Sequence, residues 1–149
     1  MAATKKIKVG LDETRMLILG AQILLGFQFR EVFADLFDEL PKATRYGSAI
    51  GILLMTMVVG LLIAPGPYHR IVLEGRDDPS LQPVISFVAE TALLPFGAAL
   101  GIDLFIAGER VFGTPIGVTV GAATAAIAVA GWYVVPYAGS LWEPYPRDE

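Results

Sequence analysis

The sequence predicts an all-α, polytopic membrane protein that folds as a single domain, a bundle of four transmembrane helices. Two long runs, Tyr46–Pro65 and Thr114–Trp142, contain no charged residue. A helix of about 20 apolar residues spans the roughly 30 Å of bilayer hydrocarbon, so each run is long enough to cross. Two further runs, which start near Met16 and Pro83, are almost as long but contain polar residues. Together the four runs leave no room for a folded soluble domain.

The first expected helix covers residues about 12–38. Its uncharged part, Met16–Phe29, is short for a span. Apolar residues recur at helical spacing after Arg30, which predicts that the helix continues along the headgroup region. Lysines precede this run as they do in a signal peptide, but no small-residue cleavage site follows, so we expect the helix to be retained.

The other three helices have clearer limits. The second covers residues about 46–64 and ends at an Ala-Pro-Gly-Pro sequence. A cytoplasmic loop at about 65–82 follows it. The third helix covers about 83–108, and Pro95 within it should cause a bend. The fourth covers about 115–138 and ends in a belt of aromatic residues, which is typical of a membrane boundary.

The composition agrees with the membrane class and excludes several functions. Apolar residues make up 54% of the chain and charged residues 17%. The net charge of −4 argues against nucleic acid as a partner. The chain has no cysteine and one histidine, so we expect no metal site and no cofactor. It also lacks a nucleophile with a nearby base, an HExxH motif and a phosphate-binding glycine loop, so we do not expect an enzyme.

Basic residues favour an orientation with both termini in the cytoplasm. In that orientation the cytoplasmic side carries seven of them: Lys5, Lys6, Lys8, Arg15, Arg70, Arg76 and Arg147. The other side carries four: Arg30, Lys42, Arg45 and Arg110.

Glu90 is the least expected residue in its segment, because apolar residues surround it about two turns into the third helix. An ionised acid in hydrocarbon costs about 2.5–3.5 kcal/mol, so this side chain should face protein or water. An acid inside a membrane can exchange protons near neutral pH or bind a cation. A hydrogen-bonded acid that holds two helices together is an equally good interpretation.

Depth along the helices predicts partners for the intramembrane acids. The first and third helices both enter from the cytoplasm, so Gln22 should lie at the depth of Glu90. Gln28 and Arg30 should lie near the depth of Asp103. We therefore expect Gln22–Glu90 and Arg30–Asp103 pairs if the two helices are neighbours, and these five residues form the predicted ion or proton pathway. For Arg30–Asp103, a structural pair close to the interface is the favoured interpretation.

Small residues predict where helices approach each other closely. Gly97 and Gly101 form a GxxxG motif in the third helix, and Gly117 and Gly121 form another in the fourth. These faces could pack inside one subunit or between subunits. We expect a homo-oligomer, because four short helices hardly enclose a polar path by themselves.

Two stretches of the chain carry a family resemblance. The first, Leu11–Phe29, contains an acidic residue and arginine followed by a Gly-x-Gln helix, with Glu13, Arg15, Gly20 and Gln22 as the matching residues. The second matches at Ala64, Pro65, Tyr68, His69 and Arg70. Both resemble a family of small four-span bacterial membrane proteins of unknown function, some of which carry an automatic sodium:proton antiporter label. The chain lacks the paired aspartates in broken helices that a typical antiporter uses.

The resemblance implies a multi-pass protein of the bacterial inner membrane, and it directs attention to two cytoplasmic groups. Glu13 and Arg15 begin the first helix, and Tyr68, His69 and Arg70 follow the second. They could form one cluster that acts as an entrance or gate, since histidine can respond to pH and arginine can bind lipid phosphate. An interfacial anchor is the simpler interpretation of Tyr68–Arg70.

These observations predict an ion- or proton-conducting membrane protein, a channel or transporter, with Glu90 as its main acid. Its partners would be membrane lipids, further copies of the chain, and protons or monovalent cations. One alternative is a non-transporting accessory or assembly subunit of a larger membrane complex. Another is a sensor of lipids or stress.

Overall fold

The computed structural model describes residues 2–35, 37–74 and 79–142, and the side chains of residues 8–35, 37–74 and 79–139. Within these ranges every regular element is helical, which confirms the all-α class. The elements are α1 (Ala2–Val32), the 3-10 turn η1 (Phe37–Glu39), α2 (Lys42–Ile63), α3 (Pro65–Ile71), α4 (Leu81–Phe112), α5 (Thr114–Val129), the π-helical segment η2 (Ala130–Val134) and α6 (Val135–Trp142).

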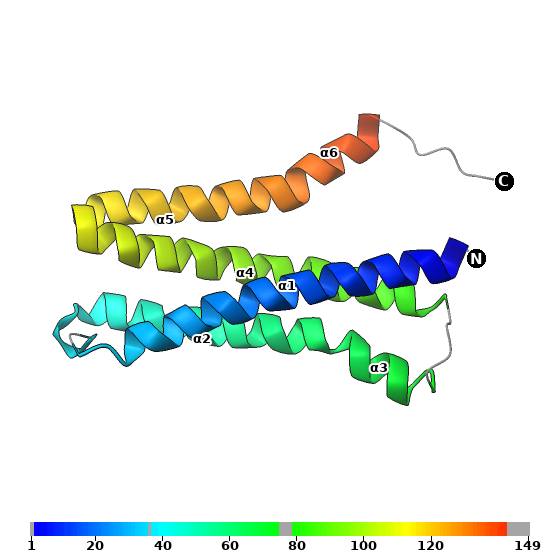
Figure 1. The fold of residues 1–149 in the computed structure, drawn as a ribbon. Helices are drawn as coiled ribbons and strands as arrows, with labels where there is room; N and C mark the ends of the chain where they lie inside the picture. The colour runs from blue at the N-terminus through cyan, green and yellow to red at the C-terminus, as the bar shows by residue number, and fades with distance from the viewer. Residues whose placement is uncertain (1, 36, 75–78, 143–149) are drawn as a thin grey trace.

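The long helices lie side by side and alternate in direction (Figure 1). Helices α1 and α4 run one way, and α2 and α5 run the other way. Helices α1, α2 and α4 pack against one another, whereas α5 packs mainly on α4 and lies at the edge of the molecule. The beginning of α1 and the end of α6, the last helix among the described residues, lie at the same end of the molecule (Figure 1).

Three helical segments are long and apolar enough to cross a membrane: Lys42–Ile71, Leu81–Phe112 and Thr114–Gly139. Helix α1 has 31 residues, but its longest uncharged run is Met16–Phe29. That run corresponds to only about 21 Å of helix, which is shorter than the hydrocarbon layer. Length and composition therefore identify three of the four expected spans.

Helix limits differ from the sequence expectation at both ends of α1 and after α2. Helix α1 begins at Ala2, because alanine and lysine, which are good helix formers, are frequent before the apolar run and no proline interrupts it. It ends at Val32 and not near residue 38. Part of the expected loop at 65–82 is helix α3. Ala64 keeps a helical backbone between α2 and α3, and Pro65 occupies the first helical position, where its missing N–H costs no hydrogen bond.

The larger of two apolar clusters in the described residues joins α1, α2 and α4. Its buried residues are Ala21, Met55, Val58, Leu62, Ala92 and Ala99. On α2 the buried positions recur every three or four residues, so they form one face of the helix. A smaller cluster around Leu81 and Ile85 packs the beginning of α4 against Leu11 and Tyr68.

Helices α4 and α5 meet through glycines. A Cβ atom on Gly117 would lie 2.6 Å from the Glu109 nitrogen, and one on Gly121 would lie 2.6 Å from the Gly101 carbonyl oxygen. Any larger side chain would separate the helices at these points. Gly97 continues the contact, because its Cβ would lie 3.3 Å from Ala128 Cβ. In this structure both small-residue faces lie inside one chain, against each other.

The π-helical turn of η2 accommodates a proline. Pro136 lacks an N–H, and in an α-helix its ring would clash with the carbonyl group of Trp132. In η2 the Val135 N–H bonds to the Ala130 carbonyl, five residues back, which widens the turn. Beyond it α6 turns away from the line of α5 (Figure 1).

Candidate functional site

Two acidic residues lie in α4, a segment long and apolar enough to cross a membrane, on opposite sides of its midpoint. The midpoint of α4 falls between Phe96 and Gly97. Glu90 and Asp103 are each about 10 Å from that midpoint along the helix axis, at 1.5 Å per residue. The hydrocarbon layer extends about 15 Å to either side of the bilayer centre. Both carboxyl groups are therefore within it if α4 is centred on the bilayer.

Asp103 is held by a glutamine from another helix. Gln28 Nε2 donates to Asp103 Oδ1 at 2.9 Å and to Oδ2 at 3.0 Å. Gln28 is only 5% exposed and Asp103 is half-buried, so this contact between α1 and α4 is partly buried. Gly51 of α2 lies against the pair, because a Cβ there would be 3.1 Å from Gln28 Nε2 and 3.5 Å from Asp103 Oδ1. Three helices therefore enclose one amide and one carboxyl group.

This pair has more acceptor atoms than donors. The carbonyl oxygen of Gln28, Oε1, is buried and has no hydrogen-bond partner among the described residues. The Gln28 amide nitrogen is the described donor to both oxygens of Asp103. Buried acceptors are nearly always satisfied in folded proteins. A proton on Asp103, a small cation or a water molecule would supply what the pair lacks.

A second polar level lies nearer the start of α2. Thr44 Oγ1 donates to Glu109 Oε2 at 2.6 Å, and Thr114 Oγ1 donates to Glu109 Oε1 at 2.9 Å. Thr44 is 1% exposed. Ser48, which is also buried, donates to the Thr44 carbonyl oxygen at 3.2 Å. These contacts were not predicted from the sequence, although Thr44, Ser48 and Gly51 share the spacing of one helix face.

On the other side of Asp103 the interior is apolar. Met55, Val58 and Leu62 of α2 pack there with Ala92 of α4 and Ala21 of α1. The space left near Leu17 and Val58 is only about 10 Å³. Polar side chains thus lead from the beginning of α2 to Asp103 and stop at the apolar core.

Glu90 and Gln22 do not form the expected pair. Both side chains are exposed, and no hydrogen bond joins them in the described part of the chain. The Glu90 backbone carbonyl accepts a hydrogen bond from the Tyr133 hydroxyl, 2.5 Å away. Depth along the helix does not fix which way a side chain points. Ala21 is fully buried in the core, and Gln22 is turned about 100° away from it around the helix.

Arg30 does not pair with Asp103, which corrects a second expectation. Arg30 is exposed, and none of the ion pairs in the described ranges includes it. It follows Gln28 by two residues, about 200° around the helix, so it points away when Gln28 points inward. Gln28 therefore occupies the position beside Asp103 that was expected for Arg30.

The expected cytoplasmic cluster is brought together in part. Arg15 and His69 line one pocket of about 360 Å³ between α1 and the α2–α3 junction. Arg15 NH1 also pairs with Asp12 Oδ1 at 3.2 Å on the surface of α1. Tyr68 packs against the Leu81 cluster. Glu13 and Arg70 are exposed and do not line the pocket.

Among the residues described, no group of three or more His, Asp or Glu side chains is placed to hold a metal ion.

The described site lies within a region that also matches a known family. The model of a family of unknown function, DUF6328, matches residues 3–136. The chain belongs to this family. The match confirms the expected membership of a family of unknown function, and it includes Gln28, Thr44, Asp103 and Glu109. No curated protein and no solved structure matches the chain.

Proposed function

We propose that this protein is an ion- or proton-conducting membrane protein in which Asp103 and Gln28 bind a proton or monovalent cation inside the bilayer. The observation that carries the proposal is the Gln28–Asp103 pair, in which the buried amide and the half-buried carboxyl group provide two acceptor groups and one donor group. A charged acid within hydrocarbon is costly and is typical of an ion or proton pathway. In this proposal Asp103, and not Glu90, is the main acid of the ion or proton pathway.

Access to the pair would come from one side only. Thr44, Ser48 and Glu109 provide polar groups between Asp103 and the beginning of α2. Met55 and Val58 close the opposite direction. Conduction would therefore require a movement that opens the apolar core, as in transporters and gated channels that expose a fixed site to one side at a time.

A four-span arrangement, with α1 as the fourth span, is part of the proposal. The outer face of α1 carries apolar side chains at a spacing of three or four residues, all more than half exposed: Met16, Leu19, Ile23 and Phe27. Such a stripe suits lipid and not water. The start of α1 and α6 share one end of the molecule, as an even number of spans requires (Figure 1). With the cytoplasmic excess of Lys and Arg, both ends would face the cytoplasm of a bacterial inner membrane.

A homo-oligomer would explain the position of Glu90. This acid is exposed on α4 between Phe87 and Leu94, which are themselves 69% and 57% exposed. A carboxyl group facing lipid at this depth is unfavourable. A second copy of the chain on this face would shield it. The same observation favours a second candidate function, a non-transporting subunit whose Glu90 face binds a different membrane protein.

Flux into liposomes tests the proposal. The purified protein would be reconstituted, and proton, sodium and potassium flux would be measured for the wild type, Asp103→Asn and Glu90→Gln. Glu90→Gln is the matched control, because it makes the same acid-to-amide change on the same helix, at the same distance from the helix midpoint but on the other side. We expect Asp103→Asn to abolish flux and Glu90→Gln to retain at least half of it.

Equal flux for the wild type and Asp103→Asn would refute the role of Asp103. Absence of flux for all three ions in the wild type would refute conduction. Purification from native membranes would then test the second candidate, which requires a stoichiometric partner of different sequence.

A further inference from the structure

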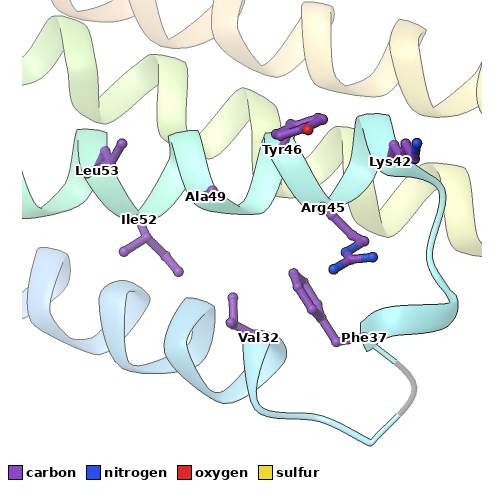
Figure 2. A pocket seen from close by; sticks show the side chains of 8 residues that line it. All are labelled: Val32, Phe37, Lys42, Arg45, Tyr46, Ala49, Ile52 and Leu53. Atoms are coloured by element: carbon purple, nitrogen blue, oxygen red, sulfur yellow. The ribbon is translucent and has the colours of Figure 1, made fainter.

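A groove on the outer side of α2 is distinct from the Asp103 site. It has a volume of about 570 Å³ and lies between α2 and the end of α1 with η1 (Figure 2). Ile52 and Arg45 extend from α2 toward it, and Val32 and Phe37 face them from the other wall (Figure 2). The groove is open on one side, and Ala49, one of its lining residues, is exposed and contributes only a methyl group.

The groove is basic at one end and apolar at the other. Lys42 and Arg45 lie at the beginning of α2, whereas Ala49, Ile52 and Leu53 lie further along it. The guanidinium of Arg45 is held in place, 5.7 Å from the centre of the Phe37 ring and 3.0 Å from Asp38 Oδ1. Asp38 is 86% exposed, so it balances part of the charge of Arg45 from the solvent side. Lys42 is exposed and forms none of the ion pairs in the described ranges.

The dimensions of the groove match one leaflet of a bilayer. Helix α2 has 22 residues, so it is about 33 Å long, close to the hydrocarbon thickness. Lys42 is its first residue and therefore lies at the membrane boundary. From Lys42 to Leu53 the helix rises about 16 Å, half of the hydrocarbon layer. Tyr46, one turn from the basic end, is exposed at the depth where tyrosines usually meet the headgroups.

We propose that this groove binds one glycerophospholipid, with its phosphate at Lys42 and Arg45 and one acyl chain along Ala49, Ile52 and Leu53. Basic side chains at a membrane boundary attract lipid phosphates. The apolar end of the groove is too deep in the membrane for a soluble ligand. The inference does not depend on ion conduction, because the groove and the Asp103 pair lie on different faces of α2.

Native mass spectrometry can test the proposal on the full chain. The protein would be purified in detergent, delipidated and titrated with phosphatidylglycerol. Two variants test the two ends of the groove: Lys42→Gln with Arg45→Gln removes the charges, and Ala49→Trp fills the apolar end. Each has a control at an exposed position outside the groove, Arg110→Gln and Ala126→Trp.

We expect one tightly bound lipid on the wild type and on both controls. Affinity should fall at least tenfold in Lys42→Gln/Arg45→Gln and in Ala49→Trp. Two further titrations distinguish the source of the phosphate. Diacylglycerol has the chains without a phosphate, and glycerol phosphate has the phosphate without chains; neither should bind as the phospholipid does.

Equal lipid affinity for the wild type and both groove variants would overturn the proposal. Competition by glycerol phosphate at the affinity of the whole lipid would also overturn it, because the site would then bind a soluble phosphate. A dimer that carries no lipid and is lost in Ala49→Trp would show that a second copy of the chain occupies the groove. Ala49 is exposed, so the tryptophan replaces no core contact, and the double glutamine variant tests the site without adding bulk.

Discussion

Gln28 donates its side-chain amide to both carboxylate oxygens of Asp103, at 2.9 and 3.0 Å, although the two residues are 75 positions apart in the chain. This contact ties α1 to α4 inside the bundle, with Gly51 of α2 directly beside it. The bond fixes the rotation of α1 about its own axis, and it also gives the Asp103 carboxyl group a hydrogen-bond donor. With Gln28 facing inward, the apolar stripe of α1 faces outward.

Gln28 and Asp103 should stabilise the fold only when both side chains are present. Gln28→Leu leaves the half-buried carboxyl group of Asp103 without its described donor, so we expect a loss of about 1–3 kcal/mol. The double variant Gln28→Leu/Asp103→Leu removes both polar groups and should be closer to wild type than the sum of the single changes. Unfolding in mixed micelles for all four proteins gives the coupling energy. Strictly additive losses would mean that the two side chains do not interact.

The Thr44 hydroxyl should contribute more to stability than a threonine hydroxyl usually does, because it donates to the carboxylate of Glu109 from a fully buried position. Thr44→Val keeps the shape and removes the hydroxyl, with an expected loss of about 1.5–3 kcal/mol for a hydrogen bond to a charged acceptor. Thr56→Val is the control on the same helix, since the Thr56 hydroxyl is exposed and bonds to its own helix at Ile52. Comparable unfolding midpoints for the two variants would contradict the importance of the Thr44–Glu109 bond.

Alanine at a contact glycine should separate α5 from α4. A Cβ on Gly121 would lie 2.6 Å from the Gly101 carbonyl oxygen and 2.7 Å from Phe105 Cβ. Overpacking of this kind costs about 1–3 kcal/mol, and we expect that loss for Gly121→Ala. Gly60→Ala meets nothing within 4 Å and should be neutral or slightly stabilising. Thermal unfolding in detergent compares them, and an unchanged melting temperature for Gly121→Ala would show that α5 does not hold this position.

A second copy of the chain on the Glu90 face should be detectable by cross-linking. The chain contains no cysteine, so single-cysteine variants need no further changes. Thr91→Cys places a thiol beside Glu90 on the exposed side of α4, and oxidation in native membranes should give a disulfide-linked dimer. Met57→Cys, exposed on α2, is the control and should stay monomeric. Dimer at both positions, or at neither, would argue against a homo-oligomeric contact at Glu90.

The correct predictions are those that depend on a property summed along one segment of the chain, such as hydropathy or length. Hydropathy summed over a segment identified the helices around Tyr46–Pro65 and Thr114–Trp142, and the structure contains helices there that are long enough to span. Distance along a helix also placed Gln28 at the level of Asp103. Small residues at Gly97, Gly101 and Gly121 indicated close approach, and the structure shows that these faces meet within one chain.

The assignment of side-chain partners needed the tertiary structure. Gln22 and Arg30 have the right depth to meet Glu90 and Asp103, but both are exposed. A rotation of about 100° per residue decides which side chain points inward, and that rotation depends on how α1 packs against α2 and α4. The contact of Thr44 with Glu109 joins positions 65 apart and has no signal in either segment alone.

By itself the sequence determined the all-helical class, three helices long and apolar enough to span a membrane, and the presence of acids within one of them, because transfer of side chains into hydrocarbon is a local property of each segment. Only the tertiary structure decided that Asp103 is held inside the bundle while Glu90 lies on its surface. The two acids lie on one helix at mirrored depths, and their difference comes from the neighbours that each face of α4 meets. Those neighbours are supplied by α1, α2 and α5, and no property of α4 alone specifies them.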